Sequence, residues 1–289
     1  MDQKAYNFMK AGSQFKGFAV GMAVLGFSIY AGTCGTIYQS GGSGTTYTDA
    51  LGDGQGSANL LRDISSATIA NDANNLYITL AINPAGNIAT GGAFNYVMGI
   101  TSGNSSAGGD TSANATTHGN AYSRAISFDS SFGGMQNFIG IFGAGGSGTA
   151  VSPYTSYGYN AYAWNTNGSS LTWSKTDQLS SGEPISAGPA GTNNTITVTV
   201  PLSDFALGFA LTPGTTFDFD IMSTGTSGGQ TAYDSLAFQG PIQGTFSATA
   251  QYNATVLDQY TITTVPEPTT LALAGLAGVS LMLFRRERK

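Results

Sequence analysis

The chain has 289 residues, of which only 9% are charged and 41 are glycine. Its hydrophobic fraction of 41%, with 11% aromatic residues, is sufficient for a hydrophobic core and argues against a disordered chain. Between residues 35 and 265, three basic residues stand against thirteen acidic ones, which argues against nucleic-acid binding because that function needs a basic surface.

The first 34 residues have the order of a secretory signal. Lysines precede an apolar run over residues 17–30, and small residues follow it. The run is shorter than the ~20 apolar residues that span a bilayer. We therefore expect residues 1–34 to form a signal helix that is removed after Ala31 or close to Cys34. Lipid attachment at Cys34 and an ordinary buried helix are the alternatives.

Three aspartates in Gly-rich surroundings open the next segment. Asp49, Asp53 and Asp63 offer carboxylates of the kind that Ca²⁺ binds at about 2.3–2.6 Å. The spacing and the final glutamate of an EF-hand are absent. Two interpretations stay open: a calcium site, or a polar loop whose aspartates terminate turns. The single histidine, His118, has no second His beside it, which argues against a zinc site.

Alternation of apolar and polar residues, the period of a half-buried strand, recurs through residues 35–264. The clear runs are 76–82, 94–100, 122–128, 196–200, 217–221 and 260–262, and the weaker ones are 64–69, 138–142, 157–164, 171–173, 233–238 and 246–252. Gly- and Asn-rich turns separate the runs, and residues 101–120 have the composition of a surface loop. Residues 202–207 indicate a short helical turn with Ser203 or Asp204 as its cap.

About ten short strands of this kind predict an all-β domain over residues 35–264. We expect an antiparallel β-sandwich or jelly roll. It would be flanked by the N-terminal signal helix and by a C-terminal hydrophobic helix.

Aromatic residues gather between positions 154 and 173. Tyr157 and Tyr159 share one strand parity, Tyr162 and Trp164 share the other, and Trp173 follows. Exposed aromatic faces bind sugar rings by stacking, so these five residues are candidates for glycan contact. The alternative is that they fill the sandwich core or cover a sheet edge.

Asp218 and Asp220 are two residues apart on a predicted strand and therefore share a face. Two such carboxylates resemble a glycosidase pair, which needs ~5–9.5 Å between them. Alternation with Phe217, Phe219 and Ile221 favours a solvent-facing position instead. No GxSxG elbow occurs, so we expect no enzymatic activity and no catalytic residues.

Residues 265–289 are the most specific part of the sequence. Val265, Pro266, Glu267 and Pro268 form an extended segment because two prolines exclude regular helix and strand. The apolar run over 271–284 would make a helix of about 21 Å, short of a ~30 Å hydrocarbon core. Basic residues that would stop transfer on the cytoplasmic side end the chain: Arg285, Arg286, Arg288 and Lys289.

This order resembles the PEP-CTERM sorting signal of Gram-negative bacteria. In that family an exosortase, a membrane protease, recognises the Pro-Glu-Pro motif, the hydrophobic stretch and the Arg-rich tail. The resemblance implies an inner-membrane-anchored intermediate, cleavage near Pro266–Pro268, and release to the cell surface or extracellular matrix. A simple C-terminal anchor is the alternative.

Short motifs in the body resemble β-sandwich domains related to family-nine carbohydrate-binding modules. They are Asp49-Ala-Leu-Gly-Asp53, Leu76-Tyr-Ile-Thr-Leu80, Phe217-Asp-Phe-Asp220 and Ala232-Tyr-Asp-Ser-Leu236. We expect an exported surface or biofilm-matrix protein with a structural or adhesive role and an exosortase as partner. The alternative is a carbohydrate-binding module for exopolysaccharide or another polysaccharide, with structural calcium. A hydrolase ranks third.

Overall fold

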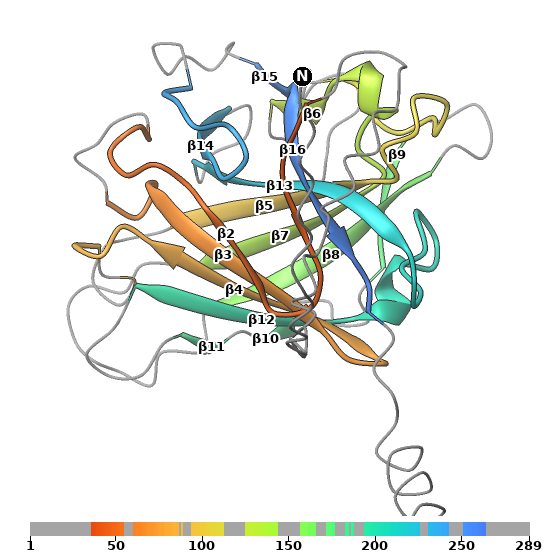
Figure 1. Ribbon diagram of the computed structural model, residues 1–289, viewed down its shortest axis with the longest axis horizontal. Coiled ribbons are helices and arrows are strands. Elements are labelled where there is room, and N and C mark those ends of the chain that lie inside the picture. Colours follow the sequence, from red (N-terminus) through yellow and green to blue (C-terminus); the bar gives the residue numbers. More distant parts are fainter. Residues whose placement is uncertain are drawn as a thin grey trace, which may run out of the picture. The chain divides into compact units, whose positions relative to one another are not determined.

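The strand-forming runs build two sheets that share one hydrophobic core (Figure 1). The structure, a computed structural model, describes residues 36–54, 60–86, 88, 94–112, 125–143, 157–165, 172–176, 183–184, 186–187, 194–225, 231–242 and 251–263. All of them belong to the unit Cys34–Lys289. Within these residues helix is limited to the 3₁₀ segments η1 (Ser130–Phe132) and η2 (Leu202–Phe205), so the expected all-β class is confirmed.

Nine strands of the described residues form the larger sheet. Its order is β1 (Thr36–Gly41), β16 (Val256–Thr261), β13 (Thr216–Thr224), β5 (Phe94–Thr101), β7 (Asn137–Gly143), β8 (Tyr157–Asn165) and β10 (Glu183–Pro184). In addition, β14 (Ala232–Ser235) pairs with β13, and β9 (Thr172–Lys175) pairs with β8.

Five strands of the described residues form the smaller sheet. Its order is β11 (Ser186–Ala187), β12 (Thr195–Pro201), β4 (Asn75–Ile82), β3 (Ile64–Asn71) and β2 (Thr45–Thr48). A third, two-stranded sheet joins β15 (Tyr252–Ala254) to β6 (Ile126–Phe128). Pairing is antiparallel except in β1–β16 and β15–β6, which are parallel.

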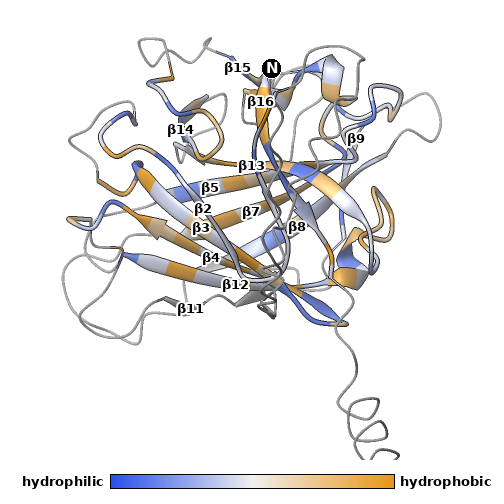
Figure 2. Ribbon diagram, in the orientation of Figure 1, coloured by the Kyte–Doolittle hydropathy of each residue, from blue (hydrophilic) through white to orange (hydrophobic). Residues whose placement is uncertain are grey.

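The inner core lies between the larger and the smaller sheet and contains every second side chain of their strands. The alternating colours along β12 show this pattern (Figure 2). Fully buried members from the smaller sheet include Leu76, Ile78 and Leu80 of β4. Fully buried members from the larger sheet include Phe217 and Phe219 of β13. Each such side chain contributes roughly 1.5–3 kcal/mol by leaving water.

A second, outer core covers the opposite face of the larger sheet. Met222 of β13 and Phe138 of β7 point to this side and pack with Phe128 of β6, Phe132 of η1 and Ala254 of β15. Because of this cover, both faces of the larger sheet are buried where β5, β7 and β13 run. The alternation of side chains along these strands therefore separates two cores rather than a core from solvent.

Local differences from the sequence expectations have simple causes. The N-cap of η2 is Pro201, and Ser203 and Asp204 lie inside the helix, so the predicted caps are wrong. Part of the predicted surface loop is packed: Asp110 is 4% exposed and forms a bridge with Met135. β1 and β2 were not expected, because both are short, polar edge strands.

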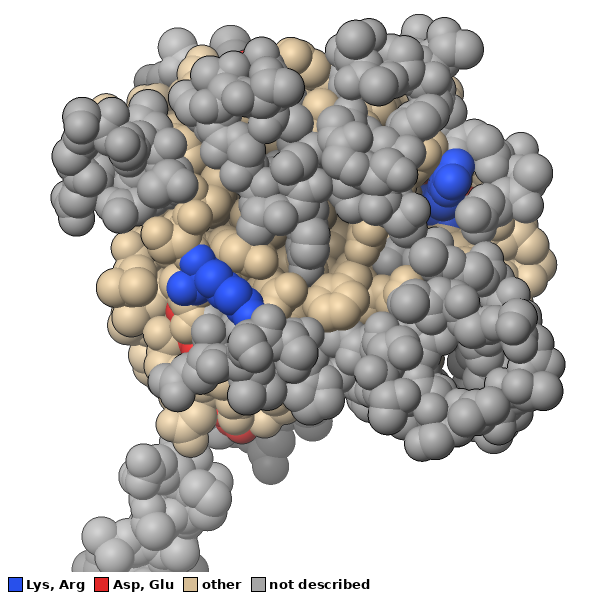
Figure 3. Space-filling model, turned by 180° about the vertical axis from the view of Figure 1, so that it is seen from behind, with Lys and Arg blue, Asp and Glu red and all other residues tan. Residues whose placement is uncertain are grey.

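Among the described residues visible in Figure 3, charged atoms are sparse, in line with the composition. The expected signal helix and C-terminal hydrophobic helix both lie outside the described residues. Within the described residues, no helix has the length and apolarity needed to cross a membrane.

Candidate metal centre

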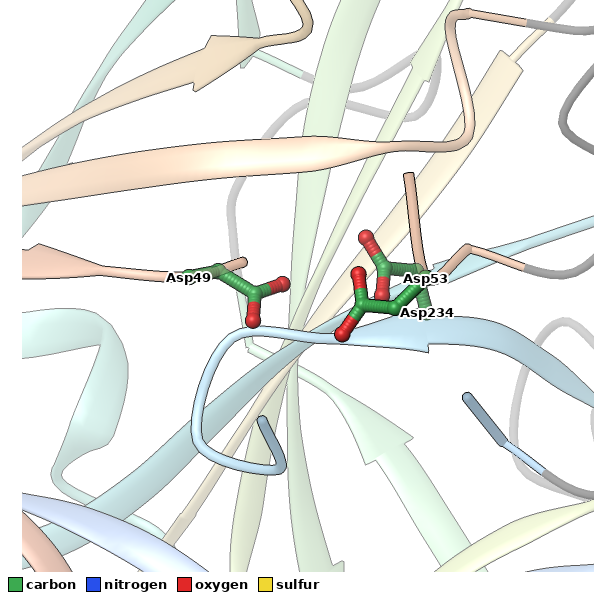
Figure 4. A group of neighbouring side chains, drawn as sticks. All are labelled: Asp49, Asp53 and Asp234. Atoms are coloured by element: carbon green, nitrogen blue, oxygen red, sulfur yellow. The ribbon is translucent and has the colours of Figure 1, made fainter. Parts of the chain in front are cut away.

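Three aspartate side chains from two parts of the chain turn their carboxylates toward one another (Figure 4). Asp49 directly follows β2, Asp53 lies in the segment between β2 and β3, and Asp234 belongs to β14 of the larger sheet. One carboxylate oxygen from each residue lies within 4.8 Å of the other two. We refer to these three residues as the aspartate cluster.

Most oxygens of the aspartate cluster receive no hydrogen bond. Both oxygens of Asp53, Oδ2 of Asp49 and Oδ1 of Asp234 are shielded from solvent and have no partner among the described residues. Asp49 Oδ1 accepts from the Ala50 N–H at 2.7 Å and from Gln239 Nε2 at 3.0 Å. Asp234 Oδ2 accepts from the Ile64 N–H at 2.6 Å. Since buried charge without a partner is costly, the cluster requires bound protons or a counter-ion.

The electrostatics of the aspartate cluster lead to the same requirement. Burial, with the charges of Asp234 and Asp53 added, raises the pKa of Asp49 to about 10. Burial raises the pKa of Asp234 to about 8, although the Ile64 N–H opposes the change. Burial also raises the pKa of Asp53. The charged neighbours that raise these pKa values are all aspartates, so the cluster concentrates negative charge.

Asp63, the third residue of the predicted calcium set, has a different role. Its carboxylate accepts from the Gly52 N–H at 3.0 Å and from Asn83 Nδ2 at 2.6 Å. Gly52 has a φ of 87°, in the left-handed region that favours glycine. The structure thus brings Asp49 and Asp53 together with Asp234, while Asp63 holds the turn that precedes Asp53.

Two further hydrogen bonds connect the residues just before β3 to the larger sheet. Ser223 of β13 donates to the carbonyl oxygen of Arg62 at 2.6 Å, and Tyr96 of β5 donates to the carbonyl oxygen of Leu61. Ser223 lies opposite Asp234 in the β13–β14 pair. These bonds hold the Ile64 N–H against the Asp234 carboxylate, so the position of Asp234 is determined by both sheets.

The predicted solvent-facing position of Asp218 and Asp220 is wrong. Their exposed fractions are 6% and 0%, because the outer face of the larger sheet is covered. Asp220 accepts from Ser235 Oγ at 2.6 Å and from the Ala237 N–H at 3.1 Å. Asp218 accepts from Gln259 Nε2 at 3.0 Å. Asp220 thus orders the turn that follows β14.

Asp258 of β16 is a further buried carboxylate, and it makes folding stability depend on pH. Its Oδ1 accepts from the Gln39 N–H at 2.9 Å, while Oδ2 is buried without a partner among the described residues. Burial, with the charge of Asp220 added, raises the pKa of Asp258 from 3.8 to about 8. Between these values the folded state holds a proton that the unfolded state has lost. Stability is therefore lost as pH rises, at up to about 1.4 kcal/mol per pH unit.

We expect Asp258→Asn, which mimics the protonated side chain, to remove this slope. Urea unfolding at pH 3 and pH 9 should show a variant equal to the wild type at pH 3, below both pKa values, and more stable than the wild type at pH 9. Asp129→Asn is the control, and its effect should be opposite. Hydrogen bonds from Ser131 lower the pKa of Asp129, so the variant should be less stable than the wild type in base. Parallel pH profiles for the wild type and Asp258→Asn would contradict the assignment.

The predicted glycan-contacting aromatics occupy two different faces of β8 and β9. Tyr159 is fully buried in the inner core, and the side chain of Tyr157 lies outside the described residues. Trp164 is 6% exposed, and its ring centroid lies 5.2 Å from that of Trp173. Tyr162 and Trp173 are half-buried and pack on the outer core. Only these last two described rings combine partial exposure with a shared face.

Trp173 is fixed in its position by polar and aromatic contacts. Its indole Nε1 donates to Asp110 Oδ2 at 3.0 Å. Its ring meets Phe138 edge-on at 4.8 Å, and Phe138 also stacks on Tyr162 at 4.7 Å. These contacts agree with the packing interpretation of Trp173 and Tyr162, whose side chains remain half-buried.

Two predicted features lie outside the described residues: the sorting motif Val265–Pro268 and the basic residues from Arg285 to Lys289. Residues 264–289 match the PEP-CTERM protein-sorting motif. The chain therefore carries an exosortase sorting signal. The PEP-CTERM motif indicates an exported protein that an exosortase processes. No curated protein and no solved structure matches the chain. The resemblance of the body to carbohydrate-binding domains stays a prediction.

Sequence reasoning missed Asp234, the most buried member of the aspartate cluster. The residue lies far along the chain from Asp49 and Asp53, and pairing of β14 with β13 brings it to them. The one local sign is an aspartate inside a short buried strand, Ala232–Ser235, where a charge needs a specific partner.

Proposed function

We propose that this protein is a non-catalytic component of the cell surface or biofilm matrix of a Gram-negative bacterium, with a structural or adhesive role. The observation that carries the proposal is the PEP-CTERM motif at residues 264–289. A membrane-anchored intermediate would hold the β-domain outside the inner membrane. An exosortase would then cut near Pro266–Pro268 and release it.

The composition and packing of the body support a structural role. A chain with few charged residues suits a protein that remains among neutral or acidic polymers. The larger sheet is buried on both faces by the inner and outer cores, which supports a rigid scaffold. A rigid scaffold with glycine-rich connections is suited to a matrix component.

Substitution of the Pro-Glu-Pro motif tests this proposal. In a host with its exosortase, we expect the wild type to reach the surface or medium in shortened form. A variant with Pro266→Ala, Glu267→Ala and Pro268→Ala should remain at full length in the inner membrane. The matched control carries Thr269→Ala and Thr270→Ala, beside the motif, and should be processed normally. Equal processing of both variants, or wild type retained in the cytoplasm, would refute the proposal.

A carbohydrate-binding module for exopolysaccharide is the second candidate, favoured by the half-buried pair Tyr162 and Trp173. Glycan-array binding that is lost in Trp173→Ala, with the far-UV circular dichroism unchanged, would favour it over a purely structural role. Trp164→Ala is less informative, because this ring is almost fully buried and its loss would disturb packing.

A further inference from the structure

We infer that Asp49, Asp53 and Asp234 bind one Ca²⁺ ion, which ties the segment between β2 and β3 to β14 of the larger sheet. The inference depends on the geometry of the aspartate cluster and is independent of the proposed surface role. It replaces Asp63 of the sequence-based set with Asp234.

Proximity of three carboxylates is the first observation, and a buried carboxylate oxygen of Asp234 without a partner among the described residues is the second. Asp234 has an exposed fraction of 0%, and its Oδ1 has no hydrogen-bond donor among the described residues. This carboxylate is turned toward Asp53 and Asp49 (Figure 4). Three further unpartnered oxygens, two on Asp53 and one on Asp49, complete the arrangement. Four acceptors without donors are what a cation requires.

The donor set favours Ca²⁺ over other common cations. All donor atoms are carboxylate oxygens, whereas structural zinc sites draw on Cys and His. Oxygens on opposite sides of a Ca²⁺ ion stand roughly 4.6–5.2 Å apart, from its bond lengths. The oxygens of the cluster lie within 4.8 Å of one another and so fit one Ca²⁺ sphere. Mg²⁺ demands near-ideal octahedral geometry, keeps several waters and is usually bound by one or two carboxylates, whereas this cluster offers three.

The position of the cluster gives the ion a structural task. Asp49 directly follows β2, an edge strand of the smaller sheet, while Asp234 lies in the larger sheet, so a shared ion links the two sheets. Gln239 contributes to the same link, since its Nε2 donates both to Asp49 Oδ1 and to the carbonyl oxygen of Thr48, each at 3.0 Å. Water and backbone carbonyls would supply the remaining oxygens of a six- to eight-coordinate ion.

Thermal unfolding of the full chain in detergent tests the inference. We expect the Tm to rise by about 5–10 °C when free Ca²⁺ exceeds its Kd about 100-fold, relative to the same protein in EGTA. Mg²⁺ at the same concentration should give less than half of this rise. Equal Tm values in Ca²⁺ and EGTA, or an equal effect of Mg²⁺, would overturn the inference.

Terbium luminescence gives a second readout that does not depend on stability. Tyr233 directly precedes Asp234 in β14, and Tyr47 of β2 lies two residues before Asp49, so these tyrosines lie close enough to excite a bound Tb³⁺ ion. We expect saturable emission at a 1:1 stoichiometry that Ca²⁺ displaces. Absence of saturable emission, or emission that Ca²⁺ does not displace, would count against the site.

Matched variants locate the ion. Asp53→Asn, in a partly exposed loop, should fold as the wild type does and weaken Ca²⁺ binding at least tenfold in both assays. Asp258→Asn is the control, because Asp258 also has one oxygen bonded to a backbone N–H and one buried oxygen without a partner. Asp258→Asn should keep the wild-type Ca²⁺ response. Wild-type affinity in Asp53→Asn, or equal loss in both variants, would contradict the assignment.

Discussion

Phe219→Ala should lower the free energy of unfolding by about 3–5 kcal/mol, the range for removal of a buried aromatic ring. Phe219 is fully buried in the inner core, on a strand of the larger sheet that is paired on both sides. Its ring meets Tyr47 of the smaller sheet edge-on at 4.9 Å and Phe217 at 5.9 Å. Removing the ring would leave a cavity between the sheets that rigid strands cannot close.

Urea unfolding of the full chain in mild detergent, followed by tryptophan fluorescence, measures this loss. The control is Leu207→Ala, since Leu207 is a large apolar residue with an exposed fraction of 74%. We expect the control to change the unfolding free energy by less than about 0.5 kcal/mol. A loss below about 1 kcal/mol in Phe219→Ala would show that the two sheets do not share this core.

Gly133→Ala should cost about 2–4 kcal/mol, from left-handed backbone strain and a steric clash together. Gly133 ends η1 with a φ of 78°. A Cβ built there would lie 1.9 Å from the carbonyl oxygen of Asn104. The segment that contains Asn104 and Gly109 packs directly on Gly133, whose carbonyl oxygen accepts from the Gly109 N–H at 2.7 Å.

Gly44→Ala separates the two contributions. Gly44 has a φ of 82°, but nothing lies within 4 Å of the position that a Cβ would take. Its substitution should therefore cost only the backbone strain, about 1–2 kcal/mol. The difference between the two variants in chemical unfolding measures the close approach at Gly133. Equal costs would mean that this loop does not pack on η1.

The strands that sequence periodicity predicted well are those with large apolar residues at every second position. β4, β12 and β13 follow this pattern, and the structure pairs β4 with β12 directly. β1 and β2 carry mainly polar residues and were missed, since an edge strand needs few apolar contacts. Pairing between β1 and β16, at opposite ends of the chain, has no local sequence signal.

The buried aspartates show the limit of reasoning from alternation. Asp218 and Asp220 alternate with apolar residues, which predicts two faces but not what covers the second. Here Ser235 and Gln259, distant in sequence, supply the hydrogen bonds that allow burial. The same limit applies to the candidate metal centre. The sequence indicated Asp49 and Asp53, but Asp234 joins them only through the pairing of β14 with β13.

The central claim is that the β-domain acts outside the cytoplasm after both ends of the chain have been removed. Intact mass spectrometry of protein recovered from the surface or medium of an exosortase-containing host tests it most directly. The account predicts a mass below the full 29.5 kDa, lacking a leader that ends near Cys34 and a tail that begins near Pro266. Recovery of the untrimmed 29.5 kDa chain from the cytoplasm would contradict it.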